Sequence, residues 1–303
     1  MAEWEAPQRR ASCSVMRANL LLFAAFLGAV PAAEPSFNYD RKIPIDLRET
    51  KVEKRDGVTV RDVTFANLRG GRTAAYLVEP VGNGKHPSVL FVHWYEPKSA
   101  DSNRTQFLTQ AEELAKKGVR SLLVETMWSD PEWYRKRNRE QDFENTVQQT
   151  KELRRAIDVL LAQPGADPKR LAYVGHDFGM MHGALLARVD GRPMAYALQA
   201  GTVSFSDWYL FGPKMPEPQR TQFVEKLSVL DPVKYIGAAK GKPVLLQFGK
   251  GDFYVPEAKA KEFAEATGEP KTVLTYDSEH PHKLNEKAIE DRQAWLVKVL
   301  GVR

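Results

Sequence analysis

The sequence is almost free of cysteine. Its only cysteine, Cys13, lies within the first 32 of 303 residues, in a segment that is typical of a removable leader. The remaining chain then has no thiol, which excludes a cysteine nucleophile, a cysteine-ligated zinc site and disulfides. This lack is compatible with an oxidising compartment but does not establish one.

A strong charge of either sign is also missing. The net charge is +5 at pH 7, and it is +4 without residues 1–32, which hold three basic and two acidic side chains. So small a surplus, spread along the chain, gives no basic surface for nucleic acid. The basic run over residues 135–139 is expected to be a solvated loop or helix start. We therefore expect no nucleic-acid partner.

Long hydrophobic runs are absent as well. The apolar run Leu20–Val30 follows Arg17 and ends at the small-residue site Val30–Ala32. It is too short for a bilayer, which needs about 20 apolar residues, and it has the pattern of a secretory signal. We expect residues 1–32 to be that signal, with Met16 as the natural start. The protein would then be secreted or periplasmic, with no stable membrane span after cleavage.

Beyond the leader, strand and helix patterns alternate. Residues 33–57 are polar and contain proline, which predicts an extended N-terminal arm before a single domain over 58–303. Within that domain we expect eight strands, at residues 61–68, 72–80, 88–94, 119–126, 170–176, 194–200, 242–249 and 271–278. Helical patterns cover residues 105–117, 142–162, 256–266 and 284–300.

This alternation predicts an α/β fold with a mostly parallel sheet and helices on both faces. One segment departs from it, because residues 202–235 are rich in aromatic side chains and proline. Since loops at the carboxyl ends of parallel strands build the ligand crevice, we expect this segment to be a small partial lid.

The segment Gly175-His176-Asp177-Phe178-Gly179 has the shape of the nucleophile elbow G-x-S-x-G, with aspartate in the place of serine. A buried strand pattern precedes it and a small-residue helix pattern follows. Such a turn exposes its central side chain above the sheet, and the two glycines avoid a collision between strand and helix. Asp177 is therefore the candidate nucleophile, and the Phe178 amide is a candidate oxyanion donor.

Two further positions fit the chain order nucleophile, acid, histidine. Asp252 follows the strand that ends at Gly249, where the acid is expected. His280 and His282 both follow the last strand. We choose His282 because it stands immediately before the final helix, and we keep His280 as the alternative base. The second oxyanion amide is expected in the turn after residues 88–94, at Trp94.

With these motifs the sequence resembles the α/β-hydrolase superfamily over residues 58–300. Its body looks most like dienelactone hydrolases and related secreted esterase-like proteins, through "AAYLVEP", "HPSVLFVHW", "DPKRLAYVGHDFG", "LQFGKGDFYVP" and "DRQAWLVKVL". Those relatives carry Cys or Ser at the elbow. An elbow aspartate resembles haloalkane dehalogenases and soluble epoxide hydrolases, and this resemblance implies Asp177 as nucleophile, His282 as base and Asp252 as its orienting acid.

Aspartate limits the chemistry. Attack on an ester carbonyl by a carboxylate gives a reactive anhydride, whereas attack on an electrophilic sp³ carbon gives an alkyl ester that water can hydrolyse. The expected substrate is thus a small molecule of the epoxide or haloalkane type, with no metal and no organic cofactor. A halide would need N–H donors such as Trp94, Trp128, Trp133 or Trp208, and an epoxide would need an acid such as Tyr95, Tyr134 or Tyr209.

Two other interpretations remain open from the sequence. The chain is a non-catalytic ligand-binding member with a degenerate elbow, or an esterase-like hydrolase in which Asp177 acts as base for a bound water. The sequence leaves the leaving group and the oligomeric state undetermined.

Overall fold

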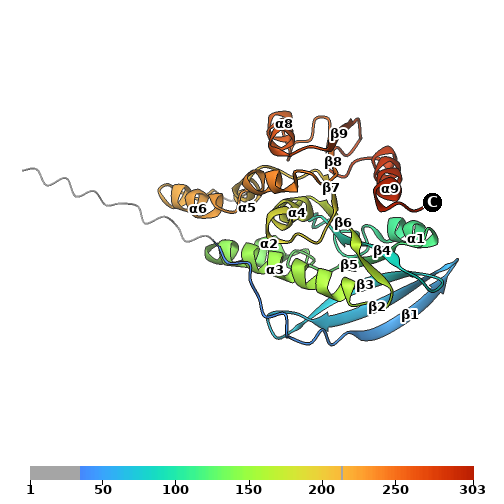
Figure 1. Ribbon diagram of the computed structural model, residues 1–303. Coiled ribbons are helices and arrows are strands. Elements are labelled where there is room, and N and C mark those ends of the chain that lie inside the picture. Colours follow the sequence, from blue (N-terminus) through green and yellow to red (C-terminus); the bar gives the residue numbers. More distant parts are fainter. Residues whose placement is uncertain (1–34, 213) are drawn as a thin grey trace, which may run out of the picture. The chain divides into compact units, whose positions relative to one another are not determined.

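A computed structural model describes residues 35–212 and 214–303 (Figure 1). The signal expected over residues 1–32 lies outside the described residues. The described chain forms one sheet of nine strands in the order β1-β2-β3-β5-β4-β6-β7-β8-β9. The sheet therefore has one strand more than the eight that the sequence predicts.

The additional strand is β1 (Arg48–Arg55), which lies inside the segment expected as an extended arm. It pairs antiparallel with β2 (Val58–Ala66), which pairs antiparallel with β3 (Arg72–Pro80). All residues of β1 but one are exposed. An edge strand of this kind carries no apolar alternation, which is why sequence patterns overlooked it.

The other strands run parallel to their neighbours, apart from the antiparallel junction of β3 with β5. Their bounds are β4 (His86–Val92), β5 (Arg120–Val124), β6 (Ala166–His176), β7 (Ala195–Gln199), β8 (Val244–Gly249) and β9 (Lys271–Tyr276). In β4, Val89 and Phe91 belong to one core cluster, and Leu90 and Val92 belong to another. Because side chains alternate along a strand, burial on both faces explains the continuous apolar run.

Helices cover both faces of the sheet (Figure 1). On one side lie α3 (Asp142–Leu161), α4 (Phe178–Val189) and α8 (Glu257–Ala266), and on the other lie α1 (Leu108–Lys116) and α9 (Glu286–Leu300). A short helix, α2 (Trp133–Lys136), and a 3₁₀ turn (Arg139–Gln141) precede α3. Parallel strands with helical crossovers on both faces are the predicted architecture.

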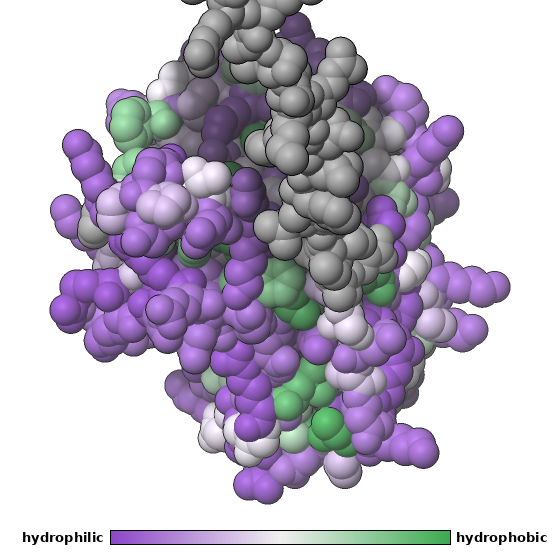
Figure 2. Space-filling model, turned by 90° about the vertical axis from the view of Figure 1, so that its left-hand side faces the viewer, coloured by the Kyte–Doolittle hydropathy of each residue, from purple (hydrophilic) through white to green (hydrophobic). Residues whose placement is uncertain are grey.

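The segment expected as a partial lid is mainly helical. It contains α5 (Phe205–Tyr209), α6 (Gln219–Ser228) and α7 (Pro232–Tyr235), and a 3₁₀ turn over Ile236–Ala239 follows. The face in Figure 2 is mainly hydrophilic, with hydrophobic residues in small separate patches. Within residues 35–212 and 214–303, no helix combines the length and the apolar character that crossing a membrane requires.

Candidate active site

The elbow lies between β6 and α4, at the carboxyl end of the central strands. Asp177 has φ 57° and ψ −118°, a conformation that non-glycine residues rarely adopt. A Cβ on Gly175 would lie 2.3 Å from the carbonyl oxygen of Gly179, and one on Gly179 would lie 2.3 Å from that of Val92. The turn is therefore too tight for side chains at either glycine. Backbone strain of this kind, worth roughly 1–3 kcal/mol, is typical of functional sites.

The carboxylate of Asp177 is nearly enclosed, with 4% of the residue exposed. Its Oδ2 accepts a hydrogen bond of 2.6 Å from the Tyr95 amide. Burial raises the pKa of Asp177 to about 7, against the opposing effects of His282 and of the Tyr95 and Phe178 amides. The elbow thus presents a carboxyl group with one oxygen held by the backbone N–H of Tyr95.

The prediction that Trp94 supplies the second amide is wrong by one residue. The Trp94 amide donates to Oε1 of Gln106 at 3.0 Å, so it does not face Asp177. The next amide, that of Tyr95, does. The Phe178 amide also favours the ionised carboxylate, which agrees with its predicted place at the start of α4. The motif locates the turn, but only the fold determines which amide points inward.

The acid and the histidine lie together as the chain order suggests. Nδ1 of His282 is 2.9 Å from Oδ2 of Asp252, and both residues are buried. The other oxygen of Asp252 accepts from the amides of Tyr254 and Val255, at 2.8 and 3.3 Å. Burial alone would lower the pKa of His282, but the Asp252 hydrogen bond and the charges of Asp177 and Asp252 raise it overall.

The alternative base, His280, is exposed at the surface of the same loop. Its Nδ1 accepts a hydrogen bond of 3.1 Å from the Lys283 amide, and its ring contacts the edge of Trp94. His282 lines the same cavity as Asp177, and His280 does not. The geometry therefore favours His282 over His280 as the base.

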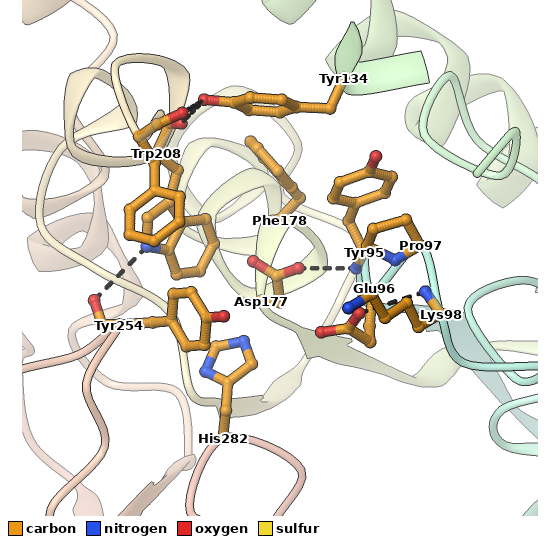
Figure 3. Close-up of a pocket in the computed structure, with 11 residues that line it drawn as sticks. Tyr95, Glu96, Pro97, Lys98, Tyr134, Asp177, Phe178, Trp208, Tyr254 and His282 are labelled. Atoms are coloured by element: carbon orange, nitrogen blue, oxygen red, sulfur yellow. Dashed lines mark hydrogen bonds between the residues drawn. The ribbon is translucent and has the colours of Figure 1, made fainter. Parts of the chain in front are cut away.

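A cavity of about 420 Å³ opens above Asp177 and His282 (Figure 3). Its walls come from the loop after β4, the elbow, the loop after β8 that carries Asp252 (the acid loop) and the expected lid. The lid segment contributes Trp208 and Phe211. Among the described residues, no cluster of three or more His, Cys, Asp or Glu side chains is placed to hold a metal ion.

The sequence-predicted halide donors are mostly engaged elsewhere. The indole N–H of Trp94 donates to Asp101 at 3.2 Å, and that of Trp128 donates to the His93 carbonyl at 3.1 Å. Trp208 lines the cavity, but its N–H points to the Tyr254 carbonyl, 3.5 Å away. Trp133 does not line the cavity. These four indoles thus form no pair of donors beside Asp177.

The three tyrosines that sequence reasoning offered as acids are also engaged. The Tyr95 hydroxyl donates to the Pro131 carbonyl at 2.8 Å, and that of Tyr134 donates to the Trp208 carbonyl at 2.6 Å. The Tyr209 hydroxyl is buried and pairs with Thr146. None of these groups is directed at the carboxylate of Asp177.

Sequence reasoning overlooked Tyr254. It lies two residues after Asp252, and its ring centroid is 5.1 Å from that of His282. Its hydroxyl points into the cavity toward His282 and Asp177 (Figure 3) and has no hydrogen-bond partner among the described residues. Partial burial and the nearby charges of Glu96, Asp252 and Asp177 raise the pKa of Tyr254, so its hydroxyl stays a donor. The only sign of this in the sequence is that Tyr254 lies close to Asp252, the expected acid.

Neither a protein-family model nor a curated protein matches this chain. Many solved structures are similar to it. The acetyl xylan esterase 1 of Thermoanaerobacterium sp. JW/SL YS485 has a TM-score of 0.66 at 16% identity, over 84% of this chain and 87% of that one. The acetyl xylan esterase of Paenibacillus sp. R4 has a TM-score of 0.67 at 16% identity, over 84% and 89%.

A third similar structure is the esterase domain of a Rhodothermus marinus protein, with a TM-score of 0.58 at 19% identity, over 80% of this chain and 98% of that one. Sequence identities of 16% to 19% are evidence for a shared fold but not for a shared activity. Together with the nine-stranded sheet and the strand-to-helix elbow, they show that the described chain has the α/β-hydrolase fold.

Proposed function

We propose that the protein is a hydrolase in which Asp177 attacks an electrophilic carbon and forms an alkyl ester that water then hydrolyses. The observation that carries this proposal is the 2.6 Å hydrogen bond from the Tyr95 amide to Oδ2 of Asp177. In a serine-type site the oxyanion amides would bind a substrate oxygen. Here the Tyr95 amide binds Oδ2 of the nucleophile itself, which leaves Oδ1 for attack.

The steps follow from this arrangement. Oδ1 forms a bond to the substrate carbon, and the bond from that carbon to the leaving group breaks with its electron pair. His282 then takes a proton from water, and the resulting hydroxide attacks the carboxyl carbon of Asp177. Negative charge develops on Oδ2, where the Tyr95 amide stabilises it, and the Phe178 amide at the start of α4 also favours negative charge on this carboxyl group. When this intermediate collapses, the bond between the carboxyl carbon and the alkoxide oxygen breaks, and the protonated His282 gives its proton to that oxygen, so that the alcohol leaves. Asp177 then loses the carboxyl proton to solvent, which regenerates the carboxylate.

Formation of the ester on Asp177 lowers the pKa of His282, the proposed base. The charge of Asp177 is one of the effects that raise the pKa of His282. Once Asp177 is an ester that charge is gone, so the His282 ring loses a proton more readily and can accept one from water. The hydrogen bond to Asp252 keeps Nδ1 protonated and directs Nε2 to the reacting water.

The leaving group is an oxygen in this proposal, as in an epoxide. Oxygen departs easily only if an acid protonates it or donates a hydrogen bond to it. The Tyr254 hydroxyl is the donor that points at the reacting centre (Figure 3), whereas the indoles do not form a halide site. The geometry thus favours an epoxide over a haloalkane.

Tyr254→Phe is therefore expected to lower kcat/KM for epoxides by about 10²-fold, because general acid catalysis contributes about that much. Hydrolysis of an activated alkyl halide by the same variant should change by less than about 3-fold, since halide departure needs no proton. Parallel kinetics with both substrate types measure this. Equal losses for both, or none for either, would contradict the assigned role.

An exposed aromatic cluster lies at the mouth of the cavity. Phe211, Phe253 and Tyr254 are 45%, 77% and 38% exposed, and their rings contact one another at centroid distances of 5.3 to 6.1 Å. Phe211 and Tyr254 also line the cavity. Contiguous exposed aromatic surface beside a pocket marks a binding site. The proposed substrate therefore bears an apolar or aryl group that extends past this cluster.

Phe253→Ala should raise KM for an aryl epoxide by about 5- to 10-fold, as expected for the loss of a ring contact worth ~1 kcal/mol. It should leave KM for a small aliphatic epoxide unchanged, because that substrate ends inside the cavity. Val81→Ala, at a similarly exposed site away from the cavity, is the control. An equal effect on both substrates would show that the cluster does not select the substrate.

One panel of substrates tests the proposal against its two alternatives. We expect turnover of epoxides and none of simple aryl esters. Turnover of esters alone would favour Asp177 as base for water, the chemistry that the esterase names of the similar structures suggest. Ligand binding without any turnover would favour a non-catalytic binding protein.

A further inference from the structure

A hydrogen-bond chain that is buried at His176 and half-buried at Gln106 joins three loops of the candidate active site. The Trp94 amide donates to Oε1 of Gln106 at 3.0 Å, and Nε2 of Gln106 lies 2.5 Å from Nδ1 of His176. Nε2 of His176 lies 2.9 Å from the carbonyl oxygen of His282. The chain thus runs from the oxyanion turn, through the residue before the nucleophile, to the histidine loop.

The direction of every bond in this chain is fixed by chemistry. The His282 carbonyl can only accept, so Nε2 of His176 carries the proton and Nδ1 must accept. Gln106 therefore turns its NH₂ group to His176 and its oxygen to the Trp94 amide. Burial holds the pKa of His176 well below its ordinary value, which keeps the ring neutral.

Packing fixes the same groups. The rings of His176 and Trp94 stack at 4.9 Å and 12°, and His176 is fully buried. The chain is therefore not a solvated surface contact. Because both ring nitrogens of this buried imidazole are hydrogen-bonded, the ring holds Gln106 and the His282 backbone in fixed positions.

We propose that Gln106 and His176 are positioning residues that align the Tyr95 amide and the His282 ring with Asp177. This inference rests on the proposed function. Gln106 binds the Trp94 amide and so orients the turn in which the following amide meets Asp177. His176 anchors the backbone of His282, while Asp252 anchors its ring.

The anchors supplied by Gln106 and His176 matter most in the second chemical step, hydrolysis of the Asp177 ester. When water attacks the Asp177 ester, the oxyanion needs the Tyr95 amide and the water needs the His282 ring. A shift of about 1 Å in such groups costs on the order of 10²-fold in rate. Formation of the ester depends less on them, because it requires neither the base nor the developing oxyanion.

Gln106→Met and His176→Phe test this inference, since both keep volume and remove the hydrogen bonds. Each should lower kcat by about 10- to 100-fold, lower KM in proportion so that kcat/KM stays within about 3-fold, and let the ester accumulate. The double variant should be no slower than the slower single variant, because either change already breaks the chain. Gln148→Met, which removes a side-chain hydrogen bond to Glu152 on α3, should leave kcat unchanged.

A second readout needs no turnover. The Tyr95 amide favours the ionised form of Asp177, so Gln106→Met should raise the pKa of Asp177 measured by carboxyl ¹³C NMR. If the wild type forms no ester, the proposed function fails, while this pKa still tests positioning. An unchanged Asp177 pKa in the folded variant, a wild-type kcat, or kcat losses that multiply in the double variant would each overturn the inference.

Discussion

Asp177→Asn is expected to abolish turnover and, at pH 8, to raise the free energy of unfolding by on the order of 2–4 kcal/mol. The amide has nearly the shape of the carboxylate, and its oxygen can still accept from the Tyr95 amide. It is no nucleophile, so the first chemical step is lost. The gain in stability follows because the buried charge at this position disfavours the folded state.

The pH dependence of that gain has a definite sign. Burial raises the pKa of Asp177 from 3.8 to about 7, so between these values the folded protein binds a proton that the unfolded chain has lost. The stability associated with this group is therefore complete below pH 3.8 and is lost as the pH rises through 7. Since one unit corresponds to about 1.4 kcal/mol, the advantage of asparagine should be about 2- to 3-fold larger at pH 8 than at pH 5.

Chemical denaturation of both proteins at pH 5 and pH 8 measures this effect. Asp277→Asn is the matched control, because its side chain is 81% exposed and should change stability by less than about 0.5 kcal/mol at either pH. If the Asp177→Asn protein is less stable than wild type at pH 8, burial of the charged Asp177 carboxylate does not destabilise the folded protein.

His282→Gln is expected to stop multiple turnover and to trap the ester on Asp177. Glutamine can still hydrogen-bond to Asp252, but it cannot take a proton from water. Ester formation needs no base, so one equivalent of substrate should react and remain attached. Intact-protein mass spectrometry should show one added substrate mass, and digestion should place it on the peptide that contains Asp177.

His280→Gln provides the control within the same loop. His280 is exposed and does not line the cavity, so this variant should keep wild-type kcat and carry no adduct. If His280→Gln traps the ester and His282→Gln turns over normally, the base has been misassigned. An adduct in neither variant would argue against a covalent ester.

Much of the parallel sheet could be predicted from the sequence, because strands buried on both faces leave continuous apolar runs such as Val89–Val92. The edge strand β1 could not, since its side chains face solvent and its pairing depends on β2 and not on its own pattern. The chain order of Asp177, Asp252 and His282 also predicted which distant positions meet: Asp177 and His282 line one cavity, and Asp252 pairs with His282 behind it.

The sequence could not predict which backbone amides and side chains face Asp177. Choosing the Tyr95 amide over that of Trp94 requires knowing that Gln106, twelve residues further along the chain, occupies the Trp94 amide. Tyr254 could have been predicted to lie near the site, because it follows Asp252 in the acid loop. Whether its hydroxyl pointed inward still depended on the packing of that loop against His282.

The central claim is the covalent ester on Asp177, and heavy-oxygen labelling tests it most directly. A single turnover of an epoxide in ¹⁸O water should leave the label in the carboxylate of Asp177 and give a product diol without it, because the product oxygen comes from the enzyme. Mass spectrometry of the peptide that contains Asp177 and of the diol reads both. Label in the diol, with none in Asp177, would show that water attacks the substrate directly.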